Sequence, residues 1–355
     1  MFNKLKQSIY FFLFFICILA VIIFTCFKKK GNSGPLITDI YTADPSAHVF
    51  EGKIYIYPSH DIENNVPSDD EGSQFDMKDY HVFSLDKIGG KVTDHGEILN
   101  VSDIPWAKKQ LWAPDAAYKN NTYYFYFPAK DKDGIFRIGA AVSKTPYGPF
   151  KAQPEYIKGS FSMDPCVFID DDGKAYMYFG GLSGGQLERW STGKYKPDGK
   201  LPSDNEPMIC PRVAKMTQDM LEFAESPNEV KILDDKNKPI KQGDFERKFF
   251  EAAWMHKYKG KYYFSYSTGH SRHIAYATGD NPYGPFIFKG YILKPVIGWT
   301  NHHSVVEFKG KWYLFYHDSS LSNGVMHLRC VKMTELHYNE DGTIKTVDPY
   351  NIKNK

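Results

Sequence analysis

The chain has 355 residues, 42% of them hydrophobic, and a formal net charge of +2 at pH 7. A chain of this length can bury a large core in one or two domains. The near-neutral charge excludes a nucleic-acid partner that would need a strong excess of Lys and Arg. The cysteines show no C-x-x-C spacing and no disulfide framework, which predicts free thiols at Cys166, Cys210 and Cys330.

The first 27 residues read as a leader. An apolar run from Ile9 to Phe27 is followed by three lysines that open a polar linker. The run is long enough to span a bilayer, so it fits a secretory signal, a lipoprotein signal with Cys26 as the lipidated residue, or a membrane anchor. We expect a leader at 1–27, a linker at 28–36 and export to the periplasm or cell surface, with membrane attachment left open.

From residue 37 onwards the chain reads as β-structure. Aromatic residues make up 16% of the sequence, and many stand in runs that suit pleated sheets. Clusters of Gly, Pro, Asn and Asp separate short β-type runs, and no long helical periodicity appears. Since no break in composition interrupts this pattern, we expect one domain over residues 37–355.

Five copies of one short segment recur along this domain. Each copy has a turn residue followed by an aromatic-rich strand, and the turn residues are Gly52, Asn121, Gly173, Gly260 and Gly310. Repeats of a supersecondary unit are typical of radially repeated folds. Five units therefore predict an all-β, five-bladed β-propeller; a β-sandwich would not explain five motifs in like positions.

Two further repeats support this architecture. Pro-Tyr-Gly-Pro-Phe occurs at 146–150 and again at 282–286, and Val213-Ala-Lys-Met-Thr resembles Val331-Lys-Met-Thr. Each follows its own turn and aromatic strand, which predicts that these segments belong to the outer parts of the blades.

One residue lies eight or nine positions before each turn residue, where the first strand of each blade would begin. These residues are Asp44, Trp112, Asp164, Glu251 and His302. Equivalent positions of a radial fold converge on one ring, so the pattern predicts an active site at the mouth of the central channel. A single Asp-Pro pair is usually a turn, but that does not explain three acids at one offset.

Three carboxylates suit the hydrolysis of a glycosidic bond. This reaction needs an acid that protonates the leaving oxygen and a carboxylate that activates water or attacks directly. Glu251 stands between Phe250 and Trp254, where loss of solvation would raise its pKa and suit an acid. Asp44 suits the base, and the charge of Asp164 would raise the pKa of the acid further.

Together these motifs resemble glycoside hydrolase family 43. The residues that carry the resemblance are, in order, Asp44-Pro, Trp112-Ala-Pro-Asp, Met163-Asp-Pro with Asp-Asp-Asp-Gly173, Glu251 before Gly-Lys-Tyr-Tyr, and Asn301-His-His-Ser. The resemblance covers nearly the whole mature chain. It implies an inverting mechanism with Asp44 as general base, Asp164 as pKa modulator and Glu251 as general acid. One departure is Ala252-Ala253, where many members have Gly-Pro or Ala-Pro.

The resemblance also implies a substrate and a metal. Members typically remove α-L-arabinofuranosyl or β-D-xylosyl units from plant polysaccharides. The residue that matches His302 commonly binds a structural Ca²⁺ in the channel, largely through water, with His303 as the alternative here; no organic cofactor is expected. Trp112, His273 and Arg329 are candidate sugar-binding residues, each with a structural role as the alternative.

Two other functions stay open. One is an endo-acting arabinanase of the same fold, because loops decide the shape of the cleft. The long insert from about Gly185 to Gly243 is a candidate contributor to that shape, but its sequence does not say how it acts. The other is a carbohydrate-binding propeller without catalytic activity, although a binding module has no need of three acids.

Overall fold

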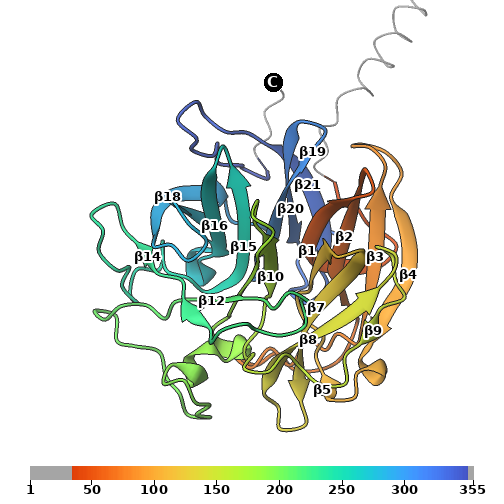
Figure 1. Cartoon of the computed structure of the whole chain (residues 1–355), viewed down its shortest axis with the longest axis horizontal. Coiled ribbons are helices and arrows are strands. Elements are labelled where there is room, and N and C mark those ends of the chain that lie inside the picture. Colours follow the sequence, from red (N-terminus) through yellow and green to blue (C-terminus); the bar gives the residue numbers. More distant parts are fainter. Residues whose placement is uncertain (1–33, 351–355) are drawn as a thin grey trace, which may run out of the picture.

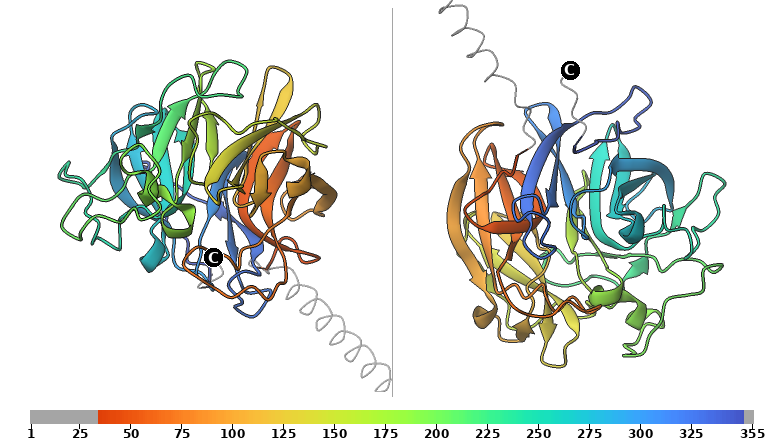
Figure 2. Two further views of the ribbon diagram at one scale, coloured as in Figure 1. Left: turned by 90° about the horizontal axis from the view of Figure 1, so that it is seen from below. Right: turned by 180° about the vertical axis from the view of Figure 1, so that it is seen from behind.

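The computed structural model describes residues 34–350, so the leader with Cys26 and residues 28–33 of the linker lie outside the described residues. Within 34–350, five small sheets are arranged around a central axis as a five-bladed β-propeller (Figure 1), as predicted. Figure 2 shows the same sheets from below and from behind. The helices among these residues are all too short or too polar to cross a membrane.

The first two blades follow each other along the chain. Blade 1 contains β1 (Tyr41–Phe50), β2 (Lys53–Asp61), β3 (Asp79–Leu85) and β4 (Thr93–Asn100). Blade 2 contains β6 (Asp115–Lys119), β7 (Thr122–Asp131), β8 (Phe136–Ser143) and β9 (Lys151–Ala152), with β5 (Ala107–Lys109) paired to the end of β7. One 3₁₀ turn, η1 (Val101–Asp103), joins the two blades.

The other three blades vary more. Blade 3 contains β10 (Cys166–Ile169), β11 (Ala175–Phe179), β12 (Arg212–Lys215) and β13 (Asn228–Glu229). Blade 4 contains β15 (Glu251–Tyr258), β16 (Lys261–Ser267), β17 (Ile274–Gly279) and β18 (Phe286–Leu293), with β14 (Ile232–Leu233) parallel to β18. Blade 5 contains β19 (His303–Phe308), β20 (Lys311–Asp318) and β21 (Cys330–Leu336). Three short 3₁₀ turns lie in loops: η2 (Ser183–Gly185), η3 (Leu187–Trp190) and η4 (Gly269–Ser271).

The five turn residues close the first hairpin of each blade. In four blades two consecutive residues have φ between 48° and 77°, and these pairs are Glu51-Gly52, Asn120-Asn121, Lys259-Gly260 and Lys309-Gly310. Two consecutive positive φ angles make a type I′ turn, whose twist matches that of paired antiparallel strands. Gly adopts this conformation without steric cost and Asn tolerates it, which explains the residue types at the repeat.

The secondary repeats occupy equivalent places. Both Pro-Tyr-Gly-Pro-Phe segments join the third strand of a blade to its fourth, in blades 2 and 4. The hydroxyl of Tyr57 donates to the carbonyl of Pro146 (2.5 Å), and that of Tyr178 donates to Pro282 (2.7 Å). One tyrosine from the second strand of the preceding blade thus ties each pair of blades together in the same way. The other repeat is confirmed too, since β12 and β21 are both third strands.

The beginning of the described chain completes the ring. The backbone N–H of Leu36 donates to the carbonyl of Val331 (2.7 Å), and that of Thr42 donates to Arg329 (2.9 Å). Residues 36–42 therefore run beside β21 and join blade 5 to blade 1. The three cysteines in the described part of the chain are free thiols, as predicted.

Gly310→Ala tests the turn explanation. Gly310 has φ +77°, and an added Cβ would meet no atom within 4 Å, so the cost is conformational. We expect the free energy of unfolding, measured by denaturant titration, to fall by about 1 kcal/mol. Gly34→Ala, at a site that is open but not left-handed, is the control and should cause no loss. Equal stability of the two variants would contradict the explanation.

Candidate active site

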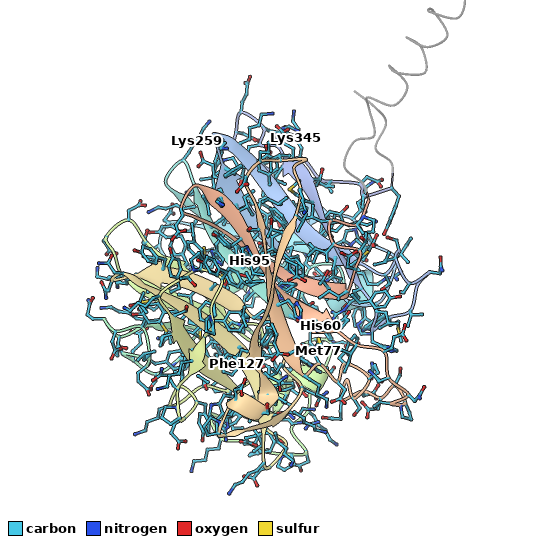
Figure 3. The ribbon with its side chains drawn as sticks, turned by 90° about the vertical axis from the view of Figure 1, so that its right-hand side faces the viewer. His60, Met77, His95, Phe127, Lys259 and Lys345 are labelled. Carbon is cyan, nitrogen blue, oxygen red and sulfur yellow. The ribbon has the colours of Figure 1, made fainter. Side chains whose placement is uncertain are left out.

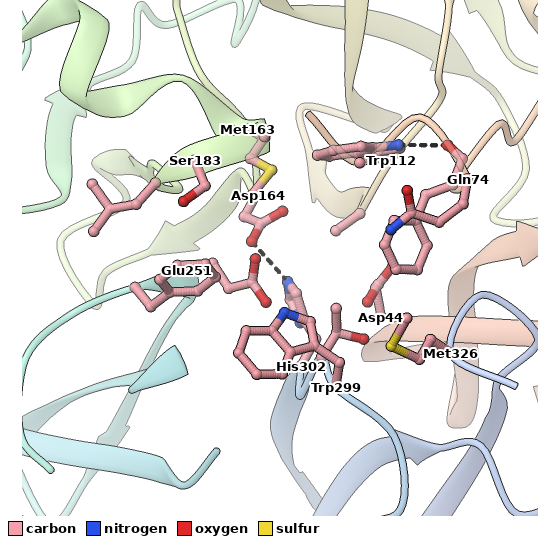
Figure 4. Close-up of a pocket in the computed structure, with 18 of the residues that line it drawn as sticks. Asp44, Gln74, Trp112, Met163, Asp164, Ser183, Glu251, Trp299, His302 and Met326 are labelled. Atoms are coloured by element: carbon pink, nitrogen blue, oxygen red, sulfur yellow. Dashed lines mark hydrogen bonds and ion pairs between the residues drawn. The ribbon is translucent and has the colours of Figure 1, made fainter. Parts of the chain in front are cut away.

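All five residues of the predicted ring line one cavity. The cavity has a volume of about 640 Å³, and its walls include Asp44, Trp112, Asp164, Glu251 and His302. Figure 4 shows Asp44 on one side of this cavity and the carboxyl groups of Asp164 and Glu251 together on the other. The shared offset in the sequence has therefore become a shared position in space.

Local kinks direct the three carboxylates into the cavity. The pairing of β1 with β2 is irregular between Ala43 and Ser46, and Asp44 has φ +48°. The pairing of β15 with β16 is irregular just after Glu251, where Ala252 has φ +63°. Asp164, just before β10, has φ +55°. Bulges of this kind re-aim side chains next to functional sites.

Asp44 is held as a carboxylate. Its Oδ1 accepts a hydrogen bond from Arg329 Nη1 (2.9 Å) and its Oδ2 accepts one from the Ser59 hydroxyl (2.8 Å). His317 Nδ1 accepts the backbone N–H of Asp44 (3.0 Å). Burial by itself would raise the pKa of Asp44, but Arg329 and His317 outweigh burial and hold the pKa well below its usual range.

Arg329 binds protein groups with all of its donors. Nε and Nη2 donate to the two carboxylate oxygens of Asp61 (2.8 and 2.7 Å), and Nη1 donates to Asp44 (2.9 Å) and to the hydroxyl of Thr300 (3.2 Å). The remaining contact joins Nη2 to Met77 Sδ (3.9 Å). Arg329, a predicted sugar-binding residue, lines the cavity, but its N–H groups have acceptors within the protein, so it positions Asp44.

Glu251 has the opposite environment. Burial raises its pKa well above the usual value, and the negative charges of Asp164 and Asp44 raise it further. Burial and the charge of Asp44 also raise the pKa of Asp164, to about 8. However, the backbone N–H of Ala252 donates to Asp164 Oδ2 (2.8 Å). This bond limits the rise in the pKa of Asp164, whereas only the more distant charge of Arg329 opposes the rise for Glu251. Glu251 is therefore the member of the pair that holds its proton more tightly.

His302 is buried beside Asp164. Its Nδ1 accepts the backbone N–H of His303 (2.8 Å), and its Nε2 lies 3.7 Å from Asp164 Oδ2. Burial lowers the pKa of His302 to about 4, so the ring is neutral at pH 7. Nε2 has no hydrogen-bond partner among residues 34–350. His303 is absent from the residues that line the cavity, and its Nε2 lies 2.6 Å from the Ser265 hydroxyl.

These surroundings fit a hydrated calcium ion. Because Nδ1 accepts a hydrogen bond, the neutral His302 ring carries its proton on Nε2, which disfavours direct ligation by that nitrogen. Asp164 offers carboxylate oxygens, which calcium and the water molecules bound to it prefer. His302 and Asp164 together therefore suit an ion that is held mainly through water.

The two remaining predictions had different outcomes. Trp112 lines the cavity, where its Nε1 donates to the Phe75 carbonyl (2.8 Å). Its ring packs on the ring of Phe136, with the two centroids 4.6 Å apart. His273 is not among the lining residues, because its ring packs against the ring of Tyr291 on β18, with the two centroids 4.3 Å apart. From the same loop, it is His270 that reaches the cavity.

Loops that showed no sequence signal complete the wall. They contribute Gln74, Phe75 and Met77 from the β2–β3 connection, Leu182–Gly185 from blade 3, and Trp299, Thr300 and Met326 from blade 5 and its approach. None of these residues stands at the repeated offset from a turn residue. Of the insert from Gly185 to Gly243, only Gly185 lines the cavity.

A five-bladed propeller with an ionised and a proton-retaining carboxyl group facing one cavity has the parts of a glycoside hydrolase. Residues 37–344 match glycosyl hydrolases family 43. The chain belongs to this family and is a glycoside hydrolase.

Curated relatives and solved structures agree with this assignment. The chain is 60% identical to xylosidase/arabinosidase 43A of Humicola insolens, over 89% of this chain and 99% of the relative. It is 55% identical to a Bacteroides ovatus xylosidase/arabinosidase, over 90% and 98%. A β-xylosidase/α-arabinofuranosidase from a compost microbial metagenome, solved with xylotriose in a calcium-free form, is 64% identical with a TM-score of 0.89, over 91% and 99%.

Proposed function

We propose that this protein removes terminal β-D-xylosyl or α-L-arabinofuranosyl units from xylan-type oligosaccharides, with inversion at the anomeric carbon. The observation that carries the proposal is the contrast between Asp44, held ionised by Arg329, and Glu251, held protonated by burial and neighbouring carboxylates. The similar enzymes from Humicola insolens and Bacteroides ovatus are both named xylosidase/arabinosidase, which supports the choice of these two sugars as substrates.

In the proposed mechanism Glu251 is the general acid and Asp44 the general base. Glu251 donates its proton to the glycosidic oxygen as the bond to the anomeric carbon breaks. Asp44 removes a proton from a water molecule whose oxygen attacks that carbon from the opposite face. The products are a sugar of inverted configuration and an alcohol, and proton exchange with solvent then restores a charged Asp44 and a protonated Glu251.

Asp164 acts through Glu251. Its charge raises the pKa of Glu251, and its carboxylate binds the backbone N–H of Ala252, the residue that follows the acid. Asp164 thus sets both the protonation of the acid and the local backbone that aims it. Trp112 offers an apolar edge for the sugar ring.

Two predictions made from the sequence enter as parts of the proposal. Calcium held beside His302 and Asp164 would supply positive charge that favours the anionic form of Asp164, and none of the steps above passes through it. Export, with attachment to a membrane through a lipid at Cys26 or an uncleaved leader, is proposed from the pattern of residues 1–27.

Substitution of the two carboxyl groups separates their roles. Asp44→Asn should lower kcat/KM by at least about 100-fold on every substrate, because no other group takes the proton from water. Glu251→Gln should lose as much on xylobiose but much less on an aryl xyloside whose leaving group needs no proton. Both variants must stay folded by circular dichroism. Substantial turnover of xylobiose by either variant would refute the assignment.

Exo and endo action are separated by the products that the wild-type protein releases from a panel of substrates that includes arabinan.

The stereochemistry is tested by the first product. Hydrolysis of an aryl β-xyloside, followed by proton NMR before mutarotation, should show α-xylose first, because water attacks opposite the leaving group. Early β-xylose would rule out inversion. Tight binding of xylotriose without any product would favour the non-catalytic alternative.

The pH profile tests the role of Arg329. Its charge lowers the pKa of Asp44, so Arg329→Gln should raise that pKa and move the acid limb of kcat/KM to higher pH by about 1–2 units. Arg329 also lowers the pKa of Glu251, so the alkaline limb should move the same way by less. A uniformly lower rate with unmoved limbs would show that Arg329 has only a structural role.

A further inference from the structure

A second cluster of metal-binding side chains lies outside the cavity, on blade 1. His60 near the end of β2 and Asp79 and His81 at the beginning of β3 offer one ligand atom each, and these atoms all lie within 4.8 Å of one another. His60 Nδ1 is 2.6 Å from Asp79 Oδ1, and His81 Nε2 is 3.8 Å from Asp79 Oδ2. The three side chains are 14–18% exposed, so an ion can reach them.

The strand geometry brings the three side chains to one face. The pairing of β2 with β3 matches Ile54 with Leu85 and Ile56 with Phe83, and the same register carried to the end of β2 sets His60 opposite Asp79. His81 follows Asp79 by two residues and so points to the same side. The rings of His60 and His81 lie 5.0 Å apart between centroids, inclined at 65°.

A third strand orients one of the histidines. His81 Nδ1 lies 3.3 Å from Asp94 Oδ1 on β4. Metal-bound histidines usually donate their second ring N–H to a carboxylate, which fixes the tautomer and turns the other nitrogen towards the ion. Asp94 therefore leaves the lone pair of His81 Nε2 directed towards Asp79 and His60.

The donor chemistry selects the kind of ion. Two imidazoles and one carboxylate suit zinc and other divalent transition metals, whereas calcium prefers oxygen ligands. With bonds of about 2.0–2.2 Å, neighbouring ligand atoms in a tetrahedral zinc site lie about 3.3 Å apart. His60 Nδ1 and His81 Nε2 lie 2.6 and 3.8 Å from the two different oxygens of Asp79, so side-chain rotations that bring one of these oxygens between both nitrogens would complete the site.

We propose that His60, Asp79 and His81 bind one divalent transition-metal ion of the zinc class, with water as a further ligand and Asp94 orienting His81. The site would join the end of β2 to the beginning of β3, next to Asp61, which holds Arg329. It is separate from the cavity, whose lining residues include none of these three. A bound ion stabilises the folded chain by mass action.

Cobalt titration of the metal-free full chain tests the proposal, because Co²⁺ takes zinc-like sites and its visible absorption reports low coordination number. We expect one equivalent of tight Co²⁺ binding that Zn²⁺ displaces and Ca²⁺ does not, and a higher Tm with Zn²⁺. His60→Ala and His81→Gln should each weaken binding at least tenfold, and their unfolding curves in chelator verify that they are folded.

Two control variants decide between sites. His95→Ala removes a histidine of the same blade (Figure 3), whose Nε2 lies 2.8 Å from the Ser84 hydroxyl, and should leave Co²⁺ binding unchanged. His302→Ala should also leave it unchanged. The proposal is overturned if no stoichiometric binding occurs, if His60→Ala and His81→Gln bind like the wild type, or if the signal disappears in His302→Ala instead. If His60→Ala and His81→Gln bind Co²⁺ like the wild type, the cluster is a hydrogen-bonded network and not a metal site.

Discussion

The buried ion network of Asp44, Arg329 and Asp61 is the constraint on which the rest of the structure depends. Arg329 comes from blade 5, and both aspartates come from blade 1, so the network lies where the ring closes. A buried cation costs much free energy unless it is well paired, and Arg329 is paired on every donor. Ring closure therefore also places the guanidinium group that keeps Asp44 ionised although this carboxyl group is buried.

The opposite side of the cavity raises the pKa of a carboxyl group instead of lowering it. Glu251 forms no ion pair with a cation among residues 34–350, feels Arg329 only weakly, and shares a desolvated region with Asp164. Like charges at short range in a buried site resist joint ionisation. One fold thus provides two carboxyl groups with different proton affinities by placing one near a cation and the other near an anion.

Much of the fold and part of the site could be read from the sequence. The turn residues such as Gly310 gave the number of blades, because a type I′ turn needs positive φ and few residue types accept it. The ring from Asp44 to His302 followed from one offset, because radial repetition brings equivalent positions together. His273 shows the limit: its place before β17 did not reveal that its ring faces Tyr291 and not the cavity.

The sequence by itself therefore determined the repeat, the five ring residues and the family resemblance, all of which depend on local backbone preference and regular spacing. Only the tertiary structure decided which partners surround each ring residue. The pairing of Arg329 with Asp44 joins residues 285 positions apart, and Thr300 and Met77 approach the same guanidinium from other loops. Proton affinity depends on burial and on neighbouring charge, which arise only when distant segments pack together.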